Sequence, residues 1–120
     1  MNKSEILNEI KIIEKGLNVQ LSDKYKQFLS EEVQDNNVYE VQTSRGETVY
    51  LYNYKDLWER NKTYGIQDVK PDYVLIGQDG DVGYFINGKG NNDRVYSLDL
   101  GALGSLDMDE EAMDIYKLIS

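Results

Sequence analysis

The chain has 120 residues and a net charge of −9, from 13 Lys and Arg against 22 Asp and Glu, and it has neither Cys nor His. This length suits one domain, which we assign to residues 1–120. The missing thiols and imidazoles exclude disulfides, thiolate or histidine metal sites and every histidine-activated nucleophile, so we expect no enzyme activity, metal or cofactor. The acidic balance disfavours direct binding to nucleic acid or to anionic membranes and favours a basic partner.

The first third of the chain is predicted to be helical. Residues 1–16 place aliphatic side chains at helical spacing, and Asn2 with Glu5 resembles a capping box. Ser22 is expected to cap a second short helix, and residues 31–37 are expected to form a loop. The N-terminal segment lacks the apolar stretch of a secretory signal, and no run approaches the roughly 18 apolar residues of a membrane span, so we expect a cytoplasmic protein.

The middle of the chain predicts a hairpin followed by a helix. Residues 38–43 and 47–52 are rich in β-branched and aromatic side chains and flank a turn that contains Gly46. Asn53 is a natural cap for a third helix, which Gly65 would end.

The second half predicts more strands and a last helix. A strand over residues 73–77 leads into Asp79-Gly80, a strong tight-turn signal, and residues 82–86 form the second arm. A further strand covers 94–98, and a helix with an apolar face and an Asp107–Glu110 capping box is expected at the end. The prediction is an α+β fold, with an antiparallel sheet of about five strands and N-terminal, middle and C-terminal helices packed on it.

The excess negative charge lies in the second half. Residues 72–120 carry 10 acids and 3 bases, a net charge of −7. Such a field steers a cationic partner, although each single acid could equally serve solubility or helix capping. The acids that we predict to face the partner are Asp79, Asp81, Asp93, Asp107, Asp109 and Glu110.

Tyrosine is unusually frequent, with 10 Tyr against 2 Phe and 1 Trp. Tyr is enriched at binding hot spots because its ring is apolar and its hydroxyl is polar. Four of these residues could lie either on an open face of the sheet, as partner anchors, or in ordinary sheet packing: Tyr39, Tyr50, Tyr52 and Tyr96.

Three motifs could in principle bind a ligand or catalyse a reaction, but each has a simpler explanation. Residues 77–83 match neither a phosphate loop nor a calcium loop, and a hairpin explains them better. Residues 88–93 would need tandem copies to bind calcium as a β-roll. Carboxylate pairs such as Asp79 and Asp81 carry little weight as a glycosidase signal in a chain with 22 acids.

Four segments together resemble the SUKH superfamily, the domains named after the yeast Smi/Knr cell-wall regulator. They are Gly16-Leu17 with residues 21–29, residues 49–52 with 57–61, residues 76–86 and residues 95–101. The resemblance implies an α+β domain without a conventional active site. In bacteria it also implies an immunity protein that binds and neutralises a toxin domain, often a nuclease, of a polymorphic or contact-dependent system.

The sequence therefore predicts a cytoplasmic immunity protein that occludes the active site of a basic toxin, with its acids in place of nucleic-acid phosphates. A non-enzymatic regulatory or scaffold protein of cell-wall or signalling assemblies is the main alternative. A small-molecule or carbohydrate-binding domain, or a carboxylate enzyme, is the third. We take a monomer as the default state.

Overall fold

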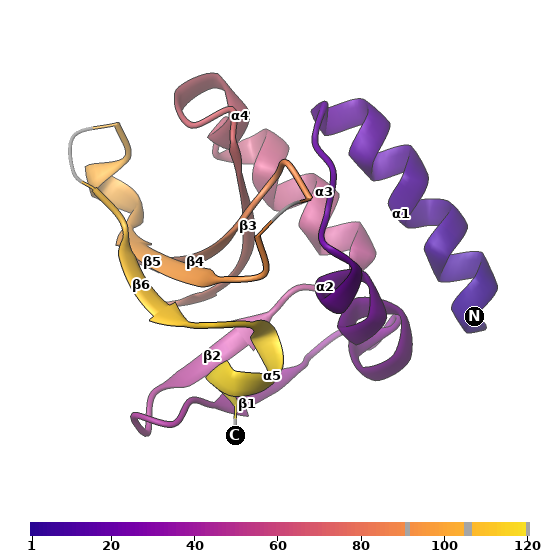
Figure 1. The fold of residues 1–120 in the computed structure, drawn as a ribbon, viewed down its shortest axis with the longest axis horizontal. Coiled ribbons are helices and arrows are strands. Elements are labelled where there is room, and N and C mark those ends of the chain that lie inside the picture. The colour runs from indigo at the N-terminus through magenta and orange to yellow at the C-terminus, as the bar shows by residue number, and fades with distance from the viewer. Residues whose placement is uncertain (91, 105–106, 120) are drawn as a thin grey trace.

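Six antiparallel strands form one curled sheet, in which the order in space follows the order in the chain (Figure 1). The computed structural model describes residues 1–90, 92–104 and 107–119. The fold is α+β, as predicted. The strands are β1 (Glu40–Gln42), β2 (Thr48–Leu51), β3 (Tyr73–Asp79), β4 (Val82–Asn87), β5 (Val95–Asp99) and β6 (Asp109–Ala112).

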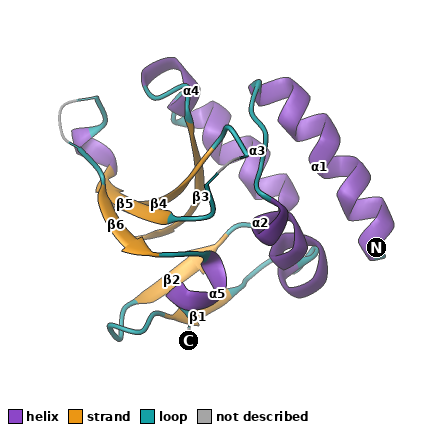
Figure 2. Cartoon of the chain, in the orientation of Figure 1, coloured by secondary structure: helices purple, strands orange, loops and turns teal. Residues whose placement is uncertain are grey.

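The helices pack on this sheet in two groups (Figure 2). Helices α3 and α4 contact β3, and α1 contacts α3. Helix α5 contacts β6 and also accepts a hydrogen bond at Leu118 O from the backbone N–H of Ser44, beside the β1–β2 turn, so it bridges the two ends of the curl. The helices are α1 (Lys3–Leu17), α2 (Asp23–Phe28) with a π-helical continuation (Leu29–Val33), α3 (Tyr54–Thr63), α4 (Ile66–Val69), a 3₁₀ turn (Leu100–Ala102) and α5 (Ile115–Leu118).

The predicted starts of the first three helices are confirmed. Asn2 and Glu5 form the reciprocal capping box of α1. The side chains of Ser22 and Asn53 accept backbone N–H groups at the starts of α2 and α3, which satisfies donors that lack a partner within the helix. The predicted loop over residues 31–37 is partly wrong, because α2 continues as π-helix as far as Val33.

The hairpin between β3 and β4 is also confirmed. Asp79 pairs with Val82, so the two turn residues are Gly80 and Asp81. Gly80 has φ +57 and Asp81 has no positive φ, which is the pattern of a type II′ turn with glycine at its first central position. The second arm predicted over residues 82–86 is part of β4, and residues 83–86 are all buried, because both faces of β4 are covered.

The predicted C-terminal helix with an Asp107–Glu110 capping box is wrong. Residues Asp109–Ala112 instead form β6, which pairs with β5, and α5 begins only at Ile115 with Asp114 as its cap. Pairing with β5 gives partners to backbone groups on an edge that would otherwise lack them. The apolar spacing that suggests a helix comes from one strand followed by one short helix.

Candidate binding surface

Two rows of cross-strand neighbours place carboxylates at one end of the curled sheet. Asp79 of β3 pairs with Val82 of β4, and Val82 pairs with Asp99 of β5. Directly opposite residues of antiparallel strands point to the same face, so Asp79 and Asp99 flank Val82 on one face. Asp81 lies in the turn beside this row, and its carbonyl oxygen accepts the backbone N–H of Leu100.

The next row lies on the same face and adds further acids. Tyr84 pairs with Ser97, and Ser97 with Asp109 of β6. The hydroxyl of Tyr84 donates to Glu47 Oε2 at 2.5 Å, and Ser97 Oγ donates to Glu111 Oε2 at 2.6 Å. We call this group of six carboxylates the acidic end: Glu47, Asp79, Asp81, Asp99, Asp109 and Glu111.

The acidic end has little compensating positive charge. In the part of the chain that the structure describes, Arg45 is the sole base paired with it, through a 3.1 Å contact from Nη1 to Glu111 Oε1. The carboxylates of Asp79, Asp81 and Asp109 are exposed and have no Lys or Arg within ion-pair distance among the described residues. Such a surface can accept hydrogen bonds from lysine and arginine side chains of a partner.

Tyr84 is the buried anchor of this site. Burial raises the pKa of its hydroxyl, and the hydrogen bond to Glu47 raises it further. The phenol therefore stays protonated and donates to Glu47 at any physiological pH. This contact fixes the Glu47 carboxylate above β4, so the acidic end includes a residue from the β1–β2 turn.

Three of the predicted acids do not join the acidic end as defined. Glu110 pairs with Tyr96 across the strands, which puts it on the opposite face, where it forms a 3.1 Å ion pair with Arg94. Asp93 precedes β5 at its other end, close enough to Lys24 to favour the charged ammonium. Asp107 is exposed just before β6.

The predicted tyrosine anchors are largely engaged within the molecule. Tyr39 is half-buried and packs edge-on against Phe28 at 5.9 Å between ring centroids. Tyr96 is half-buried against Tyr73, with centroids 5.6 Å apart, and its hydroxyl accepts a hydrogen bond from Asn92. The Tyr96 ring does not lie beside the acidic end, because Tyr96 faces the side of β5 that carries Glu110.

Tyr50 and Tyr52 are also engaged within the molecule. Tyr52 is 1% exposed and donates to the side chain of Gln78, so its burial removes it from any binding surface. Tyr50 is half-buried, and burial followed by its 2.7 Å hydrogen bond to Asp56 raises its pKa to about 12.

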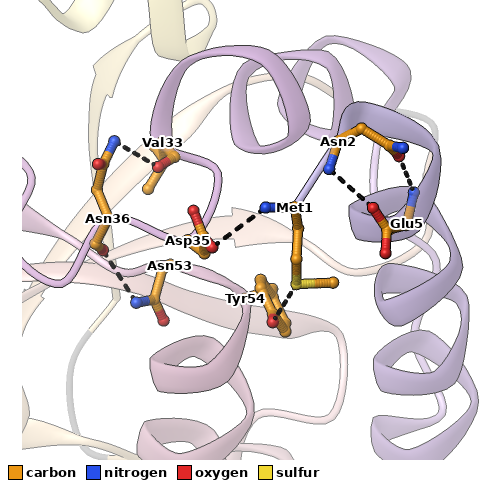
Figure 3. Close-up of polar contacts among 8 residues, drawn as sticks. All are labelled: Met1, Asn2, Glu5, Val33, Asp35, Asn36, Asn53 and Tyr54. Atoms are coloured by element: carbon orange, nitrogen blue, oxygen red, sulfur yellow. Dashed lines mark hydrogen bonds and ion pairs between the residues drawn. The ribbon is translucent and has the colours of Figure 1, made fainter.

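A polar network ties the segment before β1 to the start of α3 (Figure 3). Asn53 Nδ2 donates to Asn36 O at 2.9 Å, and the N-terminal ammonium lies 3.5 Å from Asp35. The Tyr54 hydroxyl contacts Met1 Sδ at 2.8 Å. These contacts fasten the segment before Tyr39 to the N-terminus and to the start of α3.

Three members of the acidic end were not singled out from the sequence: Glu47, Asp99 and Glu111. Glu47 is the first residue of the predicted second arm, residues 47–52, and Asp99 directly follows the strand predicted over residues 94–98. Their strand-end positions were a usable signal, because an antiparallel meander brings alternate strand ends to the same edge. Glu111 could not be found this way, because its segment was predicted as helix.

The described residues contain no group of three or more acids arranged to hold a metal ion. Among the helices the structure describes, none is both long and apolar enough to cross a bilayer. Compared with known proteins, the chain matches no family model and no curated protein. The resemblance to the SUKH superfamily therefore rests on the sequence motifs and stays a prediction.

Proposed function

We propose that this protein is a cytoplasmic, non-enzymatic immunity protein that binds a basic toxin domain through the acidic end and blocks its active site. The observation that carries the proposal is the convergence of six carboxylates, from the β1–β2 turn to β6, on one end of the sheet, where Arg45 is the sole base paired with them among the described residues. The SUKH-like motifs supply the class of partner, and the charge supplies the binding chemistry.

The mechanism follows from electrostatic complementarity. A nuclease holds its substrate with lysine and arginine side chains that contact phosphates. Exposed carboxylates of Asp79, Asp81 and Asp109 offer these cations the same kind of acceptor that phosphates offer. Val82 lies between Asp79 and Asp99 and provides an apolar contact at the centre, where water is excluded.

The first test is whether the protein binds and neutralises the toxin domain encoded by a neighbouring gene. We expect co-purification of the two proteins and protection of cells that express the toxin. Replacing Asp79 and Asp81 with Lys should abolish protection, whereas replacing Glu32 and Asp68, exposed acids outside the acidic end, should not. Equal protection by both double variants would contradict the assignment of the surface, and no protection by the native protein would contradict the proposed function.

A further inference from the structure

An apolar groove lies between α1 and α3. Both helices lie on the side of the molecule away from β6 (Figure 1). Its volume is about 310 Å³. Two large apolar side chains at this groove are open to solvent, Ile12 at 64% and Trp58 at 37%. Exposed apolar side chains gathered in one place mark an interaction surface. The groove is lined by Glu9, Ile12, Ile13, Tyr54, Lys55 and Trp58.

The indole of Trp58 rests against α1 at this groove. A Cβ atom at Gly16 would lie 2.4 Å from Trp58 Cζ3, so the ring can rest against α1 only because residue 16 is glycine. The ammonium of Lys62 lies 4.9 Å from the ring centroid on α3. Glycine inside a helix weakens the helix, and here it permits the close approach of a partly exposed tryptophan. An aromatic side chain that already packs against a neighbouring helix loses less entropy on binding than an unpacked one.

The charges around the groove indicate what occupies it. Helix α1 carries three lysines and three glutamates, and α3 carries three bases and two acids, so the net charge of −9 comes from the rest of the chain. Two copies of so acidic a protein repel one another at most of their surface, but not at this face. Within one chain, Glu9 and Lys55 line the same groove and form no ion pair among the described residues, and the Lys55 ammonium lies 5.8 Å from the centroid of the Tyr54 ring. Both charges therefore lack an opposite charge within the molecule and can meet one on a partner.

We propose that the occupant is a second copy of this chain, forming a twofold dimer through the α1–α3 groove. If the twofold axis runs parallel to the groove, α1 of each copy lies over α3 of the other copy. Residues at the same level along the groove then face one another. Glu9 then faces Lys55 of the other copy, and Ile12 faces Trp58, with each contact made twice. The acidic ends are not part of this interface and stay open to solvent in the dimer. The dimer therefore does not depend on the proposed function.

Sedimentation of the native protein from about 1 μM to 1 mM tests the dimer directly. We expect a concentration-dependent dimer whose dissociation constant rises by more than about tenfold with Ile12→Asp. Val38→Asp is the matched control, because Val38 is 68% exposed outside the groove and the change adds the same charge. A monomer throughout the range, or a dimer that tolerates Ile12→Asp as well as Val38→Asp, would overturn the proposal.

A charge swap tests the arrangement without removing apolar contacts. Glu9→Lys and Lys55→Glu should each weaken the dimer several-fold, and the double variant should return to within about twofold of the native constant. Thermal unfolding of each variant verifies that the monomer stays folded. If the double variant is as weak as the two single effects combined, Glu9 and Lys55 do not meet across the dimer and this geometry is wrong.

Discussion

At the scale of single residues, Asn61 shows how one side chain can complete a sheet. It is 1% exposed on α3, and its amide donates to Leu75 O at 2.8 Å and accepts from Leu75 N at 2.9 Å. The ladder between β2 and β3 covers Gly77 and Gln78, and the Tyr52 N–H donates to Ile76 O, so the Asn61 amide satisfies the next residue of β3, Leu75. The sequence carried a signal for this role, because Asn61 occupies a core position four residues after the buried Leu57.

Replacing Asn61 with Leu should lower the free energy of unfolding by about 2–5 kcal/mol, because the N–H and C=O groups of Leu75 lose their partner while staying buried. Urea unfolding measures this cost. Asn8→Leu on the exposed part of α1 is the control and should change stability by less than about 0.5 kcal/mol. Equal stability of the two variants would contradict the role of Asn61.

Gly80 is required by its backbone conformation alone. An added Cβ would meet no atom within 4 Å, but φ is +57. Gly80→Val should therefore cost about 1–2 kcal/mol, and Gly80→Asn should cost less because Asn tolerates this conformation. The melting temperatures of the two variants measure the difference. An unchanged melting temperature for Gly80→Val would mean that the turn is assigned wrongly.

At the scale of elements, α5 closes the curl of the sheet. Its cap, Asp114, accepts the backbone N–H of Lys117 at 2.9 Å and pairs with Lys24 at 3.1 Å. Burial raises the pKa of this carboxyl, but the Lys117 and Lys24 contacts outweigh burial and hold the pKa below its ordinary value of 3.8. The charged form therefore stabilises the fold at neutral pH.

Asp114→Ala should cost about 1–2 kcal/mol at pH 7, and Asp114→Asn should cost less because Asn also caps helices. The folded pKa is depressed, so the advantage of the native protein is complete above pH 3.8 and disappears as the pH falls through the folded value. Urea unfolding at several pH values follows this difference. A gap between native protein and Asp114→Ala that persists unchanged at pH 2 would contradict the account.

Elements that are determined by neighbouring residues could be predicted from the sequence, and elements that depend on distant contacts could not. The caps Asn2, Ser22 and Asn53 act within one turn of helix, and the sequence identified all three. Strand β6 has a distant cause, because it forms by pairing with β5 and by the Ser97–Glu111 contact. Acidic residues have low strand propensity, so the residues of Asp109–Ala112 do not by themselves predict a strand. The acidic end was partly predicted for the same reason: Asp79, Asp81 and Asp109 were identified, and Glu111 was not.

At the scale of the whole molecule, like charges gather at one end of the sheet. The acidic end places six carboxylates at one edge of the sheet with Arg45 as their paired base, and this repulsion lowers stability. A surface that is unfavourable for the free protein and favourable in a complex is typical of a binding site.

Asp79→Asn with Asp81→Asn should therefore stabilise the free protein. We expect a gain of about 0.5–1 kcal/mol, or a few degrees in melting temperature, at low salt. The gain should vanish near 0.5 M salt, where about 4 Å of screening length remains. Glu32→Gln with Asp68→Asn is the control and should give no comparable gain. Equal effects of the two pairs would show that the acidic end is not a centre of repulsion.

The most direct measurement of the central claim is the association rate with the toxin domain encoded by the neighbouring gene, from about 50 to 500 mM salt. We predict a fast rate at low salt that falls steeply as salt rises, and a slower, flatter profile for Asp79→Lys with Asp81→Lys. Glu32→Lys with Asp68→Lys changes the net charge equally and should keep the steep profile. A rate that is independent of salt, or that both reversals lower equally, would contradict binding through the acidic end.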